Sequence, residues 1–457
     1  MTPSSAPVIR VHGLLYPVKN ANGPHVPDFG PLLRPSSQGF TRPCGGLDIG
    51  CVTDTVISAP TPTKHLLKGR FGWFFAGRTV DLAGSSMTTV ALALSVLQAS
   101  GRAADLGIVL AANMIPTLAL LLLGGTVADR VSRRTVLIVS NLCTAAVMAT
   151  MAVLLLSSRY HLAVFVGLAL VGGVVNAFSQ PALRGIVPEL VERQDLQRAN
   201  ALLASSQNTV RILGPMLASV LVATVGGGWA LAADAASYLL AAAAFTRIPG
   251  TSRPPAARGP LWRDLLDGWA TFRSMHWVVV MTVSFALVNA ANVGPWNVLG
   301  AQVVLDHDGA LGWGTVQTVR AIGLLVMSIV AVKLVLRRPL RDGAAWGTLS
   351  ALPLLAVGVT GNVWVVSMAA FVGGLGLTVA SIGWETTLQA AVPEESLSRV
   401  AAYDELFSYV AIPLSQLAVG PLAAAYGAQE VIVACGVAYV VVCLLPLLNR
   451  EIRTMRA

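Results

Sequence analysis

The stretch LLLGGTVADRVSRRTVLIVS, residues 121–140, places four charged residues in one short turn between two apolar segments. The charged residues are Asp129, Arg130, Arg133 and Arg134, and the chain becomes apolar again at Val136. Apolar segments of about 20 residues cross a bilayer as helices, and short charged turns between them stay in water. This pattern predicts a membrane protein with a tight polar turn between two spans.

The composition of the whole chain supports this interpretation. Of its 457 residues, 55% are hydrophobic and only 12% are charged, whereas soluble domains carry roughly 25% charged residues. Such a chain has too few polar side chains to cover a globule in water. Its net charge of +9 comes from basic residues in the gaps between apolar runs, which indicates membrane topology and not nucleic-acid binding.

Counting apolar segments of sufficient length predicts twelve membrane helices. They cover residues 71–98, 105–127, 135–157, 161–180, 200–225, 228–246, 277–304, 311–335, 344–360, 363–384, 401–425 and 428–448. Twenty-one Lys and Arg residues fall on one side of these spans and two, Arg102 and Arg159, on the other. The positive-inside rule therefore places both termini in the cytoplasm, with the chain in the inner or plasma membrane.

The longest gap between spans divides the chain into parts. Residues 1–63 contain ten of the 25 prolines and no helical period, which predicts a disordered N-terminal extension. Six-helix bundles are expected at 64–246 and 277–449, with a cytoplasmic tail at 450–457. The linker, 247–276, contains an amphipathic segment expected to lie at the membrane interface, with an apolar face formed by Leu261, Leu265, Leu266, Trp269 and Phe272.

The two halves repeat each other. Pro188 and Pro393 precede spans 5 and 11 and are 205 residues apart, and the pairs Gly214-Pro215 and Gly420-Pro421 are 206 apart. We expect both Gly-Pro pairs to break their helices. The sequence thus predicts an all-α membrane protein of two pseudo-symmetric six-helix bundles, as in transporters built from parallel repeats.

The charged turn has a recognisable spacing: Gly125-x-x-x-Asp129-Arg130-x-Ser132-Arg133-Arg134. It resembles the loop signature of the major facilitator superfamily, with Ser132 in place of a glycine. The resemblance implies the major facilitator fold and a cytoplasmic gate in which Gly125, Asp129, Arg130, Arg133 and Arg134 latch the two halves. The alternative is simple positive-inside anchoring, which explains the arginines but not the aspartate.

Further stretches, among them GIVPELVERQDLQRANAL and RVAAYDELFSYVAIPLSQLAVGPLAA, are similar to the macrolide-efflux and enterobactin-exporter branch, the transmembrane secretion effectors. This resemblance covers about residues 68–448. It implies alternating-access export of a drug, siderophore or secondary metabolite, driven by proton antiport. A facilitator, an importer or a non-transporting sensor or scaffold remains an alternative.

Charged residues within the spans are costly in lipid and suggest functional sites. Asp81 lies three residues after Arg78 in span 1, so the two can form a self-neutralising pair, or Asp81 can couple proton flow to transport. Arg211 and Arg320 lie in spans 5 and 8, which face each other in this fold. They can hold an anionic substrate, one can pair with Asp81, or Arg320 can bond the backbone or Gln317.

A polar patch in span 7 surrounds the Gly294-Pro295 pair. Broken helices often mark binding sites, so the patch either lines the substrate cavity or makes packing contacts; its residues are Asn289, Asn292, Trp296 and Asn297. Asp404 and Glu405 start span 11 and are candidate partners for the arginines of the gate, with helix capping as the alternative. Asp234 in span 6 is expected to make structural hydrogen bonds.

Enzyme motifs are missing from the sequence. It contains no G-x-x-x-x-G-K-[ST] phosphate loop, no H-E-x-x-H and no G-x-S-x-G, so we expect neither an enzyme nor a bound cofactor, and no metal site. The remaining enzyme alternative, a membrane-embedded transferase, would need an acidic cluster outside the membrane. The expected partners are a small-molecule substrate, protons and the lipid bilayer, with no nucleic acid, and the chain is expected to be a monomer.

Overall fold

The computed structural model describes residues 8–11, 14–17, 69–128, 132–192, 195–248, 261–331 and 336–455. It forms two compact units, Met1–Ala59 and Pro60–Ala457. In the first unit, β1 (Val8–Val11) and β2 (Leu14–Pro17) pair as an antiparallel hairpin, with Val8 opposite Pro17. This hairpin was not predicted. The other residues of the predicted N-terminal extension lie outside the described residues, so their disorder stays a prediction.

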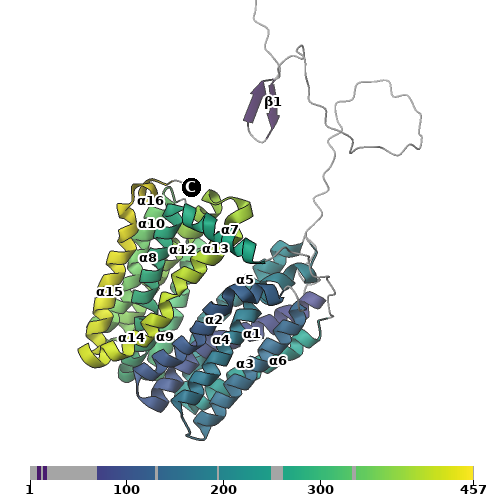
Figure 1. Cartoon of the computed structure of the whole chain (residues 1–457). Helices are drawn as coiled ribbons and strands as arrows, with labels where there is room; N and C mark the ends of the chain where they lie inside the picture. The colour runs from purple at the N-terminus through teal and green to yellow at the C-terminus, as the bar shows by residue number, and fades with distance from the viewer. Residues whose placement is uncertain are drawn as a thin grey trace, which may run out of the picture. The chain divides into compact units, whose positions relative to one another are not determined.

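The first half of the larger unit contains six long helices, drawn from purple to teal in Figure 1. They are α1 (Arg70–Ser100), α2 (Ala103–Ala128), α3 (Arg133–Leu156), α4 (Leu162–Leu190), α5 (Leu196–Val225) and α6 (Gly227–Thr246). Ser132 caps α3, because its hydroxyl accepts a hydrogen bond from the Thr135 amide at 3.2 Å. The residue that replaces glycine in the charged turn therefore starts the next helix.

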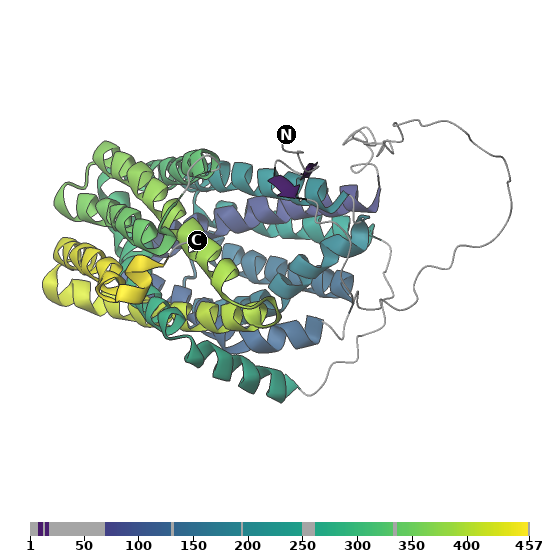
Figure 2. The same ribbon diagram turned by 90° about the horizontal axis from the view of Figure 1, so that it is seen from above.

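The second half begins with α7 (Leu261–Ser274) and is drawn from teal to yellow. It continues with α8 (His276–Gly294), η3 (Pro295–Gly300), α9 (Ala301–Ala331), α10 (Pro339–Gly347), η4 (Thr348–Ala351), α11 (Leu352–Val359), α12 (Val363–Ala391), α13 (Glu394–Tyr409), α14 (Ala411–Tyr426), α15 (Ala428–Leu444), η5 (Leu445–Leu448) and α16 (Arg450–Thr454). Figure 2 shows the two halves on opposite sides of the unit.

The predicted membrane crossings are present. Within the described residues, eleven helical segments are long and apolar enough to cross a membrane. One of them, His276–Ala331, contains two of the predicted spans, because Gly309 has a φ of 70° and interrupts the helical path. Only glycine adopts this left-handed backbone without strain, so Gly309 separates span 7 from span 8.

The packing of the helices repeats in the two halves. In the first half α2 packs on α4, α3 on α6, and α1 on α5 and α6. In the second, α9 packs on α12, α11 on α15, and α8 on α14 and α15. Between the halves, α5 contacts α9 and α14 contacts α2. The two contacts between the halves are also equivalent under this repeat, so the unit is a pair of pseudo-symmetric bundles.

The predicted amphipathic helix is α7, but its apolar face is not left entirely to the membrane interface. Trp269 and Phe272 pack against Tyr403 and Phe407 of α13, with ring centroids 5.6 to 6.0 Å apart. Phe272 is only 3% exposed. Aromatic packing therefore attaches the segment between the halves to the second half.

Candidate functional site

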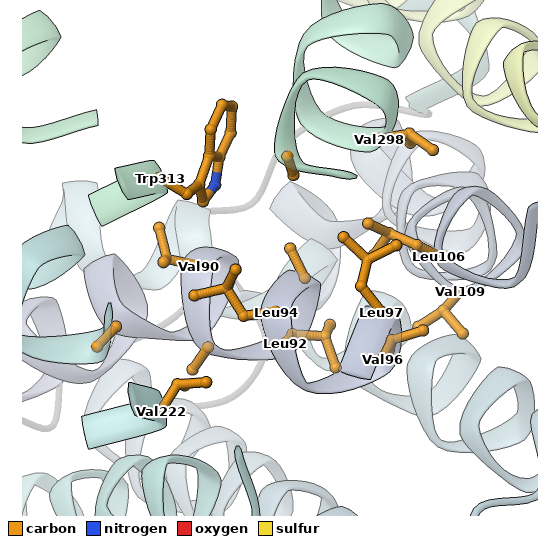
Figure 3. Close-up of a cluster of buried hydrophobic side chains, with 14 of the residues drawn as sticks. Val90, Leu92, Leu94, Val96, Leu97, Leu106, Val109, Val222, Val298 and Trp313 are labelled. Carbon is orange, nitrogen blue, oxygen red and sulfur yellow. The ribbon is translucent and has the colours of Figure 1, made fainter. Parts of the chain in front are cut away.

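Apolar side chains from both halves close one end of the unit. A single buried cluster joins Val90, Leu94 and Leu97 of α1 and Leu106 of α2 to Val298 and Trp313 of the second half (Figure 3). We call this the closed end. The opposite end, where α1 begins and α2 ends, is the arginine-rich end. There the clusters are separate, one around Phe71 and Phe245 and another around Phe272 and Trp384.

Small residues let the helices of the two halves meet at the closed end. A methyl group on Gly107 of α2 would overlap the main-chain oxygen of Gln416 on α14. One on Gly314 of α9 would overlap the side chain of Ser219 on α5. The sequence did not single out these glycines, because a glycine in a membrane helix is common and its spacing does not name the partner helix.

A tyrosine outside the spans supports the closed end. The Tyr160 hydroxyl donates to an Asp105 carboxylate oxygen at 3.4 Å, and Arg102 lies 4.0 Å from the same carboxylate. Burial, and then the negative charge of Asp105, raise the pKa of Tyr160 to about 12. The phenol therefore remains a hydrogen-bond donor throughout the physiological pH range.

A cavity of about 620 Å³ lies between the halves. Its polar lining is Asn208, Arg211, Gln317, Arg320, Ser328, Thr378 and Ser381, and its apolar lining is Pro215, Ala321, Leu324, Leu325, Leu377 and Ile382. These residues come from α5 in the first half and from α9 and α12 in the second. The volume is that of a drug-sized ligand site. We call this the central cavity; it brings together Arg211 and Arg320, as the sequence predicted.

Arg320 is held by an aromatic ring. Its guanidinium carbon lies 5.1 Å from the ring centroid of Trp296, a cation–π contact worth about 0.5–2 kcal/mol. The Trp296 indole donates to Gln317 Oε1 at 3.0 Å, and Trp313 lies 5.0 Å from Trp296, centroid to centroid. Residues lining the central cavity thus touch the buried tryptophans of the closed end.

Asp81 pairs with Arg78 and not with Arg320. The Arg78 guanidinium donates to the Asp81 carboxylate, which is 6% exposed. Of the predicted cavity residues, Arg78 therefore belongs to a buried ion pair within α1, and it does not line the central cavity. Thr88 of α1 donates to Asp234 of α6 at 2.5 Å, which confirms a structural hydrogen bond for that aspartate.

The polar patch of span 7 is divided between different surroundings. Asn289 donates to the Ser408 carbonyl at 2.9 Å and lines a second cavity, whereas Trp296 is buried beneath Arg320. Asn292 and Asn297 line neither of the two cavities, and the structure shows no hydrogen bond from them to the residues it describes. The expected break at Gly294-Pro295 is the π-helical turn η3, so the helix changes register and does not end.

The other two Gly-Pro pairs do not break their helices, contrary to prediction. Helix α5 is continuous through Pro215, and α14 is continuous through Pro421. The glycines serve close packing instead: a side chain on Gly214 would overlap Ser86 of α1, and one on Gly420 would overlap Ala104 of α2. Transmembrane helices tolerate such prolines because neighbouring groups satisfy the freed carbonyl.

The charged turn holds its own half together in this conformation. Arg133 binds Glu189 of α4 at 2.8 Å, and Arg134 donates to the carbonyls of Phe245 and Thr246 at the end of α6, at 3.3 and 2.6 Å. Gly125 lies within α2, whereas Asp129 and Arg130 lie outside the described residues. A latch between the halves is thus not formed by Arg133 or Arg134 here, and the gate stays a prediction.

The predicted gate partners line the second cavity, inside the C-terminal bundle. This cavity of about 570 Å³ is lined by helices of the second half, with Glu385, Asp404 and Glu405 as its acidic residues. Asp404 is 8% exposed and accepts hydrogen bonds from Thr282 at 2.6 Å, Trp384 at 3.2 Å and Ser408 at 3.2 Å. These donors were not predicted, because they come from three different helices.

Comparison with known proteins agrees with this architecture. The model of the Major Facilitator Superfamily matches residues 74–415. The chain belongs to the Major Facilitator Superfamily. As a member it is a multi-pass membrane protein of a family of small-molecule transporters, and this confirms the family resemblance and the fold class inferred from the sequence.

Its relatives include efflux pumps. The multidrug efflux pump Tap of Mycolicibacterium fortuitum is 28% identical, over 77% of this chain and 88% of that protein. The enterobactin exporter EntS of Citrobacter koseri is 25% identical, over 61% of this chain and 67% of that protein.

Solved structures show the same fold at low identity. The nucleoside transporter NupG has a TM-score of 0.66 at 13% identity, covering 83% of this chain and 98% of that one. A bacterial homolog of the human lysosomal transporter Spinster, in an inward-facing and unoccupied conformation, has a TM-score of 0.67 at 14% identity, covering 87% and 98%.

Proposed function

We propose that this member of the superfamily is a secondary active exporter, which moves a small molecule out of the cytoplasm by alternating access in exchange for protons. The central cavity carries the proposal, because both halves line it and a shared apolar cluster seals only one end. Rocking the halves about this cavity would open the closed end and expose bound solute on the other side.

The orientation follows from the arginines. The arginine-rich end is the cytoplasmic end under the positive-inside rule, so the structure corresponds to a conformation that receives solute from the cytoplasm. The latch at the turn containing Asp129 and Arg130 would then form in the opposite conformation. The efflux relatives Tap and EntS support export as the direction. The protein is proposed to act as a monomer in the plasma membrane.

Asp81 is the proposed proton site. It is a buried carboxylate on α1 whose only ion-pair partner in the described part of the chain is Arg78. Protonation would release Arg78, and this changes the charge that α1 presents to its neighbours. A buried ion pair can also be purely structural, and then the protein would be a facilitator with no proton requirement.

The test is dye flux into everted vesicles that contain the full chain, with a pH gradient imposed and then collapsed. Dye is eluted from the collected vesicles and read at one fixed pH. Accumulation should need the gradient, and Asp81→Asn should reduce gradient-driven flux at least tenfold while downhill exchange continues. Asp234→Asn, which changes another buried aspartate, should retain the gradient dependence.

Flux that persists after the gradient is collapsed would make the protein a facilitator. Uptake only in right-side-out vesicles would make it an importer. No flux of any dye, antibiotic or siderophore would leave a non-transporting sensor as the better account.

A further inference from the structure

We infer that the central cavity selects organic anions that carry a flat apolar ring, and that Arg320 selects the charge. The inference rests on the proposed transport function and names the substrate class of that same cavity. Its basis is the set of ionisable groups that face the cavity: Arg211 and Arg320 line it, and no acidic residue does.

Arg320 carries an uncompensated charge. Among the residues that the structure describes, no carboxylate lies within 4.0 Å of its guanidinium, and its neighbours are the Trp296 ring and the neutral side chain of Tyr439. A ring face attracts a cation but does not neutralise it. A charge removed from water without a partner is destabilising, so a ligand anion entering the cavity would relieve that cost.

The geometry of a guanidinium suits this role. Because the ring of Trp296 holds Arg320 against one side of the cavity, the charged group is positioned before the ligand arrives. Its planar fork of N–H donors fits a carboxylate or sulfonate with two parallel hydrogen bonds. Gln317 is oriented by the same tryptophan, through the hydrogen bond from the indole, and offers its amide group beside the arginine.

The sign of the charge is specific to this cavity. The cavity inside the C-terminal bundle is similar in size but has the opposite lining, with Glu385, Asp404 and Glu405 and no Lys or Arg. The two cavities share a wall formed by Leu377 and Ser381 of α12. Positive charge is therefore concentrated where both halves face each other.

The rest of the lining indicates the remainder of the ligand. Pro215, Leu324, Leu325, Leu377 and Ile382 give the central cavity an apolar surface. A volume of about 620 Å³ accommodates a ligand of two or three fused rings with its acid group. An amphiphilic organic anion satisfies both surfaces, whereas a cation of the same shape would meet only the apolar one.

The experiment compares two dyes with the same xanthene ring: fluorescein, a dianion at pH 7.5, and rhodamine 123, a cation. Binding to the full chain in lipid nanodiscs is measured at equilibrium by fluorescence anisotropy. We expect fluorescein to bind at least tenfold more tightly than rhodamine 123. Arg320→Gln should weaken fluorescein binding at least tenfold and leave rhodamine 123 within twofold, whereas Arg320→Lys should weaken fluorescein binding less.

The control is Arg102→Gln, which removes a positive charge from an exposed residue at the closed end and should change neither affinity. The inference is overturned if rhodamine 123 binds as tightly as fluorescein, if fluorescein does not bind, or if Arg320→Gln binds it normally. Arg320→Lys serves this comparison if the glutamine variant does not fold.

Equilibrium binding requires no gradient, so the two proposals can fail separately. A chain that binds fluorescein but transports nothing would sink the proposed function and leave the anion selectivity. A chain that exports both dyes equally and binds them equally would do the reverse.

Discussion

Gly107 of α2 lies directly against the main-chain carbonyl of Gln416 on α14, so the two halves touch at a point that has no room for a side chain. Together with Gly314 against Ser219, it brings the helices close enough for the apolar cluster of the closed end to form. The contact exists because glycine has no Cβ, and this makes it a precise place to perturb the closed end.

Gly107→Val should hold the halves apart at the closed end. We expect the variant to favour the conformation that is open there, because the valine side chain would overlap the Gln416 carbonyl. The measurement is the labelling rate of Leu97→Cys, which is 5% exposed in the cluster, by a membrane-impermeant maleimide in a cysteine-free background. The rate should rise at least tenfold.

Gly167→Val is the matched control for this experiment. It makes the same substitution in α4, where no neighbouring atom lies within 4 Å of the added carbon. Its labelling rate should stay at the level of the unmodified glycine. Equal rates for Gly107→Val and Gly167→Val would mean that the Gly107 contact does not control the closed end.

Arg134 should stabilise the N-terminal bundle. Its guanidinium binds the last carbonyls of α6, where a cation also interacts favourably with the helix dipole. Arg134→Ala should lower the free energy of unfolding by about 1–2 kcal/mol, seen as a lower melting temperature in detergent. Arg341→Ala, which removes a pair between adjacent residues on an exposed surface, should have little effect. If the two variants melt together, the α3–α6 link is not stabilising.

Phe272 should attach α7 to the second half. Phe272→Ala removes a buried ring that packs on Tyr403 and Phe407, a change that costs about 3–5 kcal/mol in a protein core. We expect faster amide hydrogen exchange throughout α7. Leu266→Ala, on the same helix at a side chain that is 50% exposed, should leave the exchange rates unchanged, and an equal rise in both variants would contradict this assignment.

Tyr160 should contribute an alkaline pH dependence. Its pKa in the folded chain, about 12, lies above the value of about 10 for an unperturbed tyrosine. A raised folded-state pKa gives stability that is fully present below pH 10 and is lost as the pH rises through 12. The difference in melting temperature between the wild type and Tyr160→Phe should therefore shrink between pH 10 and 12. A constant difference across that range would show that the phenol does not titrate as proposed.

The architecture was predictable because lipid imposes two strong constraints on the sequence. A span must be apolar over its full length, and the turns must carry their charges on one side, so hydropathy alone located twelve crossings. The repeated Pro188 and Pro393 then revealed the duplication. Ser132, a departure from the family signature, caps α3.

The inner faces of the helices were not predictable in the same way. In a soluble helix the apolar face points inward, but a membrane helix is apolar on both its buried and its lipid-facing sides. Hydropathy therefore gives no rotation, and the sequence did not pair Arg320 with Trp296 or Asp404 with Thr282. The two Gly-Pro pairs were misjudged for a related reason, because their glycines respond to a neighbouring helix that the local sequence does not name.

The apolar cluster of the closed end has a consequence for how this chain can change over evolutionary time. Hydrophobic association has no preferred direction, so Val, Ile and Leu can replace one another at Val90, Leu94 or Val298 if the total volume is kept. Gly107 has no such freedom. Random mutagenesis with selection for transport should therefore recover many neutral exchanges in the cluster and almost none at the glycine.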